Sequence, residues 1–169
     1  AFGVGIESAV PRVREGLMNK CLTQDELMHG LELFKRNGFK PVGNFIIGFP
    51  GEQKKEMIES INFACKMIDK GYLHGANIVP WLPLPGSEAT RAIQKSGELP
   101  KNFDFTQISL SVVCHAPKGM TIPELDKLRK WGVWKVNSRP RILKKYFMDW
   151  RTFIMAVVIF LRIFVPNFL

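Results

Sequence analysis

The segment from Pro41 to Glu52 constrains the fold more than any other part of the chain. Residues 42–49 are rich in β-branched and aromatic side chains and carry no charge, which is typical of a strand buried on both faces. A tight turn containing Gly51 follows, and apolar residues then recur at helical spacing from Gln53 to Lys70. Strand, turn and helix form half of a βαβ unit, so the sequence predicts an α/β fold with ligands at the carboxyl ends of its strands.

Two similar units flank this segment. A first strand is predicted at Phe2–Ile6, followed by a short helix that begins near Pro11 and a longer helix that opens with a capping box at residues 23–26. A third strand, Ala76–Trp81, leads into a helix from about Glu88 to Lys95. Three successive strand–helix units, each with a helix long enough for a right-handed crossover, predict part of a (β/α) barrel.

The chain divides in composition near Gly97. Residues 1–98 contain the three strand–helix units and are predicted to form the barrel part. Residues 99–169 are predicted to form a mostly helical extension that is both basic and apolar. Within it, the alternating residues Ile108–Val112 predict an edge strand, and a capping box at residues 121–124 predicts a further helix.

The net charge of +9 is concentrated at the end of the chain. Residues 118–169 carry eleven basic and three acidic residues, which is +8 of the total. An uncharged run at residues 152–161 follows most of these basic residues and is too short for a membrane span. We therefore expect peripheral contact with the inner face of a membrane, or a helix packed on the body. Nucleic acid is not expected as a partner, because no recognised binding module accompanies the charge.

Three isolated cysteines, Cys21, Cys65 and Cys114, provide neither a disulfide framework nor the spacing of metal ligands. This pattern favours a reducing, cytoplasmic setting and predicts no metal ligand within the chain.

The three strand ends offer different chemistry to a ligand. Glu7 and Ser8 follow the first strand and provide a carboxylate and a hydroxyl for hydroxyl or amine groups. Residues 46–48 and 79–81 end the other two strands and are apolar, which suits a flat ring. Because a barrel assembles its site from strand ends, this combination fits a nucleoside, with the sugar on the first end and the base on the others. The alternative for Glu7 is a surface or helix N-terminal carboxylate.

Four short motifs also carry a family resemblance. Gly-Ile-Glu-Ser at residues 5–8, Met-Asn-Lys at 18–20, Phe-Ile-Ile-Gly-Phe-Pro-Gly-Glu at 45–52 and Pro-Leu-Pro-Gly-Ser-Glu at 83–88 occur in order with helix-length gaps. Together they resemble the second half of the radical S-adenosylmethionine barrel, in the subgroup with an N-terminal cobalamin-binding domain. The resemblance implies a parent enzyme in which a 4Fe–4S cluster cleaves S-adenosylmethionine to start radical chemistry, and it leaves a use of cobalamin open. It also implies cofactor-binding roles for Glu7, Ser8, Ile46, Gly48, Ile78 and Pro80.

The sequence departs from that family in two respects. The cluster-binding cysteine triplet and the glycine-glycine-glutamate segment are absent, and in the family both belong to the half that precedes this one. We therefore expect the chain to be a fragment that is inactive without its N-terminal half, with its catalytic residues and its small-molecule or lipid substrate unidentified. Glu52 lies one position beyond the usual place after Gly48 and is expected to cap the following helix.

Two alternatives remain open at the level of sequence. The chain could be a non-catalytic remnant whose basic, apolar tail docks on a membrane or a partner. It could also belong to another (β/α) barrel enzyme that binds a phosphorylated ligand at its strand ends. The latter requires a further strand–turn–helix unit with a glycine-rich phosphate loop after Gly97, and none is visible.

Overall fold

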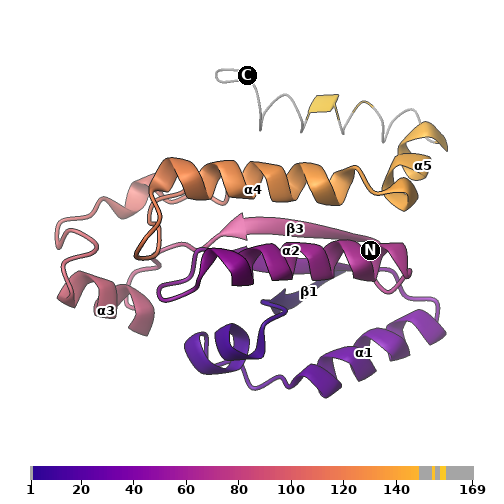
Figure 1. Ribbon diagram of the computed structural model, residues 1–169, viewed down its shortest axis with the longest axis horizontal. Helices are drawn as coiled ribbons and strands as arrows, with labels where there is room; N and C mark the ends of the chain where they lie inside the picture. Colours follow the sequence, from indigo (N-terminus) through magenta and orange to yellow (C-terminus); the bar gives the residue numbers. More distant parts are fainter. Residues whose placement is uncertain (1, 149–153, 155–156, 159–169) are drawn as a thin grey trace.

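The computed structural model describes residues 2–148, 154 and 157–158 and shows a mixed α/β fold (Figure 1). Its sheet has three parallel strands in the order β1-β2-β3, with β2 in the centre. The strands are β1 (Phe2–Glu7), β2 (Pro41–Ile47) and β3 (Gly75–Pro80). Helices lie between and after the strands, namely the π-helix η1 (Arg12–Leu17), α1 (Gln24–Arg36), α2 (Lys54–Asp69), α3 (Glu88–Lys95), the 3₁₀ turn η2 (Phe105–Gln107), α4 (Ile122–Asn137) and α5 (Pro140–Met148).

Local sequence signals explain where these helices begin and end. Thr23 and Thr121 each accept a hydrogen bond from the backbone N–H three residues later, and Glu26 and Glu124 complete the two predicted capping boxes. Gly38 follows α1 with a φ of 72°, a left-handed conformation that a glycine adopts without strain. These local interactions therefore account for where α1 begins and ends and for where α4 begins.

Helices α1, α2 and α4 cover one face of the sheet and share its main hydrophobic core (Figure 1). Phe45 and Ile47 of β2 are completely buried in this core, together with Ile61 of α2 and Leu125 of α4. A second, smaller cluster lies at the carboxyl end of the sheet, where Trp81 packs with apolar residues of α3 and of the segment that follows it. These three helices do not cover the opposite face of the sheet.

The three predicted strand–helix units are confirmed, and they form a parallel sheet as expected. A barrel is not shown, because the strands of the described residues form an open three-stranded sheet. Helix α4 packs beside α2 in the same core as the sheet. The division of the chain at residue 98 stays a prediction.

The predicted edge strand at Ile108–Val112 is wrong. Asp104 instead accepts a hydrogen bond from the Thr106 N–H and starts η2, and no strand follows it in the described part of the chain. Leu110 is 63% exposed and Val112 is 48% exposed, so the apolar side chains of the alternating pattern do not pack together against the core.

Most of the predicted apolar run at residues 152–161 lies outside the described residues. Among the helices that are described, none combines the length and the apolar character that crossing a bilayer requires.

Candidate functional site

The face of the sheet opposite the helices carries polar side chains. Side chains alternate between the two faces along a strand, so Asn44 and Ile46 point away from the core that contains Phe45 and Ile47. Asn77 of β3 pairs in register with Asn44 and donates a hydrogen bond from Nδ2 to Asn44 Oδ1 at 2.9 Å. We call this surface the open face of the sheet.

Glu7 extends the open face to the end of β1. Its backbone has a φ of 66°, and the β1–β2 register shifts between Gly5 and Glu7. A positive φ is rare for a residue other than glycine and is strained, and such strain concentrates at functional sites. A Cβ on Gly5 would collide with the Glu7 carboxylate, so the glycine leaves the space in which this side chain lies over β1.

Lys20 holds the Glu7 carboxylate in this position. Its Nζ donates to the Gly5 carbonyl oxygen at 2.6 Å and to Glu7 Oε1 at 3.0 Å. The Glu7 side chain remains 24% exposed. Glu7 is therefore an oriented carboxylate that stays accessible at the carboxyl end of a strand.

Ser8 is fully buried and uses its hydroxyl within the protein. Ser8 Oγ lies 3.1 Å from Ser60 Oγ of α2 and accepts a hydrogen bond from the Val10 N–H at 3.2 Å. Ser60 Oγ also accepts from the Ala9 N–H. This network ties the end of β1 to α2 and does not present the hydroxyl to the open face.

The predicted ring-binding residues separate between the two faces of the sheet. Ile46 is half-buried next to the Trp81 cluster, and it pairs in register with Val79 of β3. Ile78 is buried in the core beneath the helices, and Pro80 is also buried. The structure therefore brings Glu7 and Ile46 to the open side of the sheet, whereas Ser8, Ile78 and Pro80 are enclosed.

Gly48 lies at the turn after β2 and has a φ of 81°. A Cβ at this position would collide with Leu125 of α4, so this glycine allows α4 to approach the strand end. The Gly48 N–H donates to Glu52 Oε2 at 2.7 Å, and the Phe49 N–H donates to the same oxygen at 3.1 Å.

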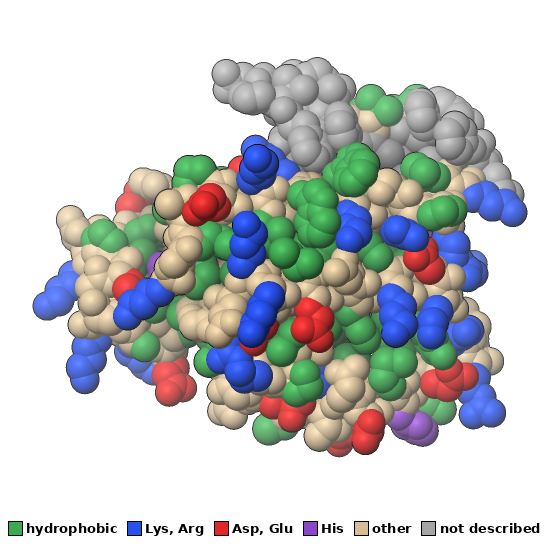
Figure 2. Space-filling view, viewed as in Figure 1, with side chains coloured by type: hydrophobic (Ala, Val, Ile, Leu, Met, Phe, Trp, Pro, Cys, Tyr) green, Lys and Arg blue, Asp and Glu red, His purple; other side chains and the backbone are tan. Residues whose placement is uncertain are grey.

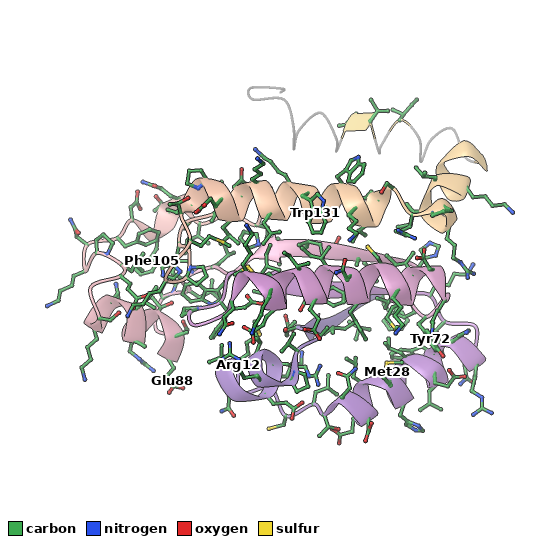
Figure 3. The ribbon with its side chains drawn as sticks, viewed as in Figure 1. Arg12, Met28, Tyr72, Glu88, Phe105 and Trp131 are labelled. Atoms are coloured by element: carbon green, nitrogen blue, oxygen red, sulfur yellow. The ribbon has the colours of Figure 1, made fainter. Side chains whose placement is uncertain are left out.

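The prediction that Glu52 caps α2 is wrong, because its carboxylate closes the Gly48–Phe49 turn. Gln53 is the N-cap residue of α2, and Glu56 accepts its backbone N–H at 2.8 Å. The pKa of Glu52 is raised to about 7, chiefly by burial and to a smaller extent by the nearby Glu56 carboxylate, against the opposing effects of the two turn N–H groups and Arg12. Arg12 reaches the first turn of α2 from η1 (Figure 3) and binds Glu56 through two hydrogen bonds.

Sequence reasoning missed the roles of Lys20, Asn44 and Asn77. Lys20 belongs to the Met-Asn-Lys motif at residues 18–20, but only the structure shows it against Glu7. The two asparagines carried a readable signal, because a polar residue within an otherwise apolar strand needs a hydrogen-bond partner. Over the described part of the surface in Figure 2, lysine and arginine side chains are spread out and do not gather in one patch.

No family model matches the chain. Among curated proteins, it is similar to one from Pyrococcus horikoshii that is named an uncharacterized methyltransferase. The two are 31% identical over 153 residues, which is 89% of this chain and 32% of that protein. The chain thus spans about a third of the length of this relative.

This comparison contradicts the prediction of a radical S-adenosylmethionine enzyme. The relative is named as a methyltransferase, and its name includes neither radical chemistry, a 4Fe–4S cluster nor cobalamin. Within the described residues, no group of three or more histidine, cysteine, aspartate or glutamate side chains is arranged to hold a metal ion. A methyltransferase relative makes S-adenosylmethionine a plausible ligand. The two alternatives, a docking module or another barrel enzyme, are not better supported than a methyltransferase.

Proposed function

We propose that this chain forms part of an S-adenosylmethionine-dependent methyltransferase and contributes to cofactor binding at the open face of its sheet. The observation that carries the proposal is the Glu7 carboxylate, which a strained backbone and Lys20 hold at the end of β1. The methyltransferase relative supports the choice of cofactor. The proposal extends to the whole protein, because methyl transfer, the methyl acceptor and any partners concern more than the part that this chain spans.

The chemistry of the open face fits the cofactor in two parts. Glu7 offers acceptor oxygens to the ribose hydroxyls, and a charge-assisted hydrogen bond of this kind is about twice as strong as a neutral one. Ile46 and Val79 pair in register and offer apolar surface to the adenine ring. Asn44 and Asn77 lie beside them and carry amide groups able to bond a ring nitrogen or amine. Bound there, the cofactor supplies an electrophilic methyl group to an acceptor.

Lys20 acts as a positioning residue in this scheme. It neutralises Glu7 Oε1 and fixes the direction of the carboxylate through its second bond to the Gly5 carbonyl oxygen. Removing its charge frees the carboxylate to rotate, so we expect a smaller loss of cofactor affinity than removal of Glu7 itself causes.

The test is calorimetric titration of S-adenosylmethionine into the full chain and its variants. Glu7→Ala is expected to weaken binding at least tenfold, since a hydrogen bond to a charged group contributes about 1.5–3 kcal/mol. Glu59→Gln is the matched control, because Glu59 is exposed on α2 at a distance from the open face. Equal affinity of the Glu7→Ala and Glu59→Gln variants, or no saturable binding by the unaltered chain, would refute the proposal.

A further inference from the structure

A small cavity lies between the first turn of α2 and the segment that leads into α4. Its volume is about 210 Å³, which is enough for a small molecule or the charged end of a larger one. Its lining includes Glu52, Lys54, Lys118, Gly119 and Glu124. None of these residues belongs to the open face, so the cavity is a separate site.

The positive ends of two helices meet at this cavity. Helices α2 and α4 each have 16 residues and begin at Lys54 and Ile122. Capping boxes already engage part of the first N–H groups of both helices, and Pro123 of α4 has no N–H, so the helix dipoles supply most of the partial positive charge there. Lys54 and Lys118 add two full positive charges. Glu124 is already engaged, because its Oε2 accepts the Thr121 N–H and hydroxyl at 2.8 Å each.

Glu52 provides a second and independent sign of a ligand. The residue is only 3% exposed, and its Oε2 accepts the two N–H groups of the Gly48–Phe49 turn. Its Oε1 has no hydrogen-bond partner, one of two such buried side-chain atoms in the described part of the chain, the other being His115 Nδ1. A buried carboxylate oxygen without a partner is unfavourable, so Oε1 needs either a donor or a proton.

The surroundings decide between these two options. A cationic donor would have to bind next to two lysines and two helix N-termini, and the Glu124 carboxylate in the lining, which could attract it, is already held by Thr121. A proton on Oε1 removes the carboxylate charge and converts the oxygen into a hydrogen-bond donor. Such a donor, together with two lysines and two helix N-termini, suits an acceptor that carries negative charge.

We propose that this cavity binds a small oxyanion, such as a phosphate or carboxylate group, which accepts a hydrogen bond from protonated Glu52 and pairs with Lys54 and Lys118. The proposal does not depend on the methyltransferase assignment. Lys118 already lies 3.3 Å from Glu98 Oε1, so the anion competes with Glu98 for this lysine.

Binding of the anion should take up a proton. The pKa of Glu52 lies at about 7 because of burial, and the charged groups around it are Glu56 and Arg12 in addition to Lys54, Lys118 and Glu124. Below this pKa the carboxyl group is neutral and donates to the anion. Above it the carboxylate repels the anion, so affinity should fall by roughly tenfold for each pH unit above 7.

Sulfate is the probe, because its charge does not change between about pH 6 and pH 8. The amide NMR signals of Phe49 and Gly119 are followed during a sulfate titration at constant ionic strength, with chloride as the balancing ion. We expect saturable shifts at these two amides and an affinity that is about tenfold higher at pH 6 than at pH 8. Absence of saturation at pH 6, or an affinity independent of pH, would overturn the proposal.

Three variants separate the contributions. Glu52→Gln keeps one acceptor for the turn and places an uncharged amide donor at the other position, so its affinity should not depend on pH. Lys118→Ala should weaken sulfate binding several-fold, and Lys95→Ala on α3 is the matched control that should not. The proposed site would be contradicted if the Glu52→Gln variant gives the NMR spectrum of a folded protein but does not bind sulfate. Equal losses of sulfate affinity in the two lysine variants would also contradict it. Phosphate and acetate, titrated at pH 6, then identify which oxyanion the cavity prefers.

Discussion

Glu52 gives the sharpest prediction for stability, because its pKa differs strongly between the folded and unfolded chain. The ordinary value is 4.5, and burial raises the pKa in the folded protein to about 7. A difference of about 2.5 between the two values corresponds to about 3 kcal/mol of unfolding free energy. Replacing Glu52 by glutamine removes the ionisation and therefore this whole contribution.

The direction follows from where the proton is bound. Below about pH 4.5 Glu52 is neutral in both states and makes no pH-dependent contribution. Between pH 4.5 and about 7 the unfolded chain loses the proton that the folded chain keeps, so stability falls as the pH rises. Above about pH 7 the full loss is present. The Glu52→Gln variant should therefore gain up to about 3 kcal/mol over the unaltered chain between acid and mildly alkaline pH.

The assay is urea denaturation of both proteins from about pH 3 to pH 8 in chloride buffers, since an oxyanion would hold the proton on Glu52. Glu56→Gln is the matched control, because Glu56 lies in the first turn of the same helix. Its hydrogen bonds with Arg12 lower its pKa, so its contribution is present above the ordinary pKa and is lost as the pH falls. The two variants must change in opposite directions with pH. Parallel stability curves for the Glu52→Gln variant and the unaltered chain would refute the reasoning.

Three further predictions follow from packing and from the tail. Gly48→Ala should lower the free energy of unfolding by about 2–4 kcal/mol, because of backbone strain and the collision with Leu125. Gly38→Ala, at a similar φ but in open space, should lower it by only about 1–2 kcal/mol, and equal losses in thermal unfolding would contradict this. Arg14→Met should cost about 3–5 kcal/mol in urea denaturation, because the buried guanidinium donates to the carbonyl oxygens of Ser8 and Leu22, and an unchanged midpoint would refute it. The basic tail should bind anionic vesicles in a salt-dependent way, and truncation after Lys135 should remove this binding. If the truncated chain still co-sediments with anionic vesicles, the tail is not the membrane-binding segment.

Much of the fold could be predicted from the sequence because its signals are local. The capping boxes at Thr23 and Thr121 determine where α1 and α4 begin, whatever lies beside them. The uncharged run in β2 could be recognised as a buried strand for the same reason. The segment Ile108–Val112 failed because alternation predicts a strand only when a neighbouring strand edge is available, and that edge depends on the whole fold.

The candidate site was less predictable, because its geometry depends on contacts between distant residues. Ser8 looked accessible in the sequence, but Ser60, 52 positions later, encloses its hydroxyl. β3 is apolar at consecutive positions, so periodicity alone could not show that Val79, and not Ile78, points away from the helices. The Lys20–Glu7 pair lies where the β1–β2 register shifts, and no pattern in the sequence predicts that shift.

The parallel pairing of the strands also bears on how the chain folds. Phe2 pairs with Pro41, 39 positions later, and closing a loop of that length costs about 3 kcal/mol of chain entropy before any contact compensates for it. The capped helix α1 lies within this loop and shortens the distance that the chain must close. We therefore expect α1 and α2 to form and collapse first, and the strands to pair afterwards and slowly, as is common for parallel sheets. The surface that carries Glu7 then exists only after the last and slowest step of folding.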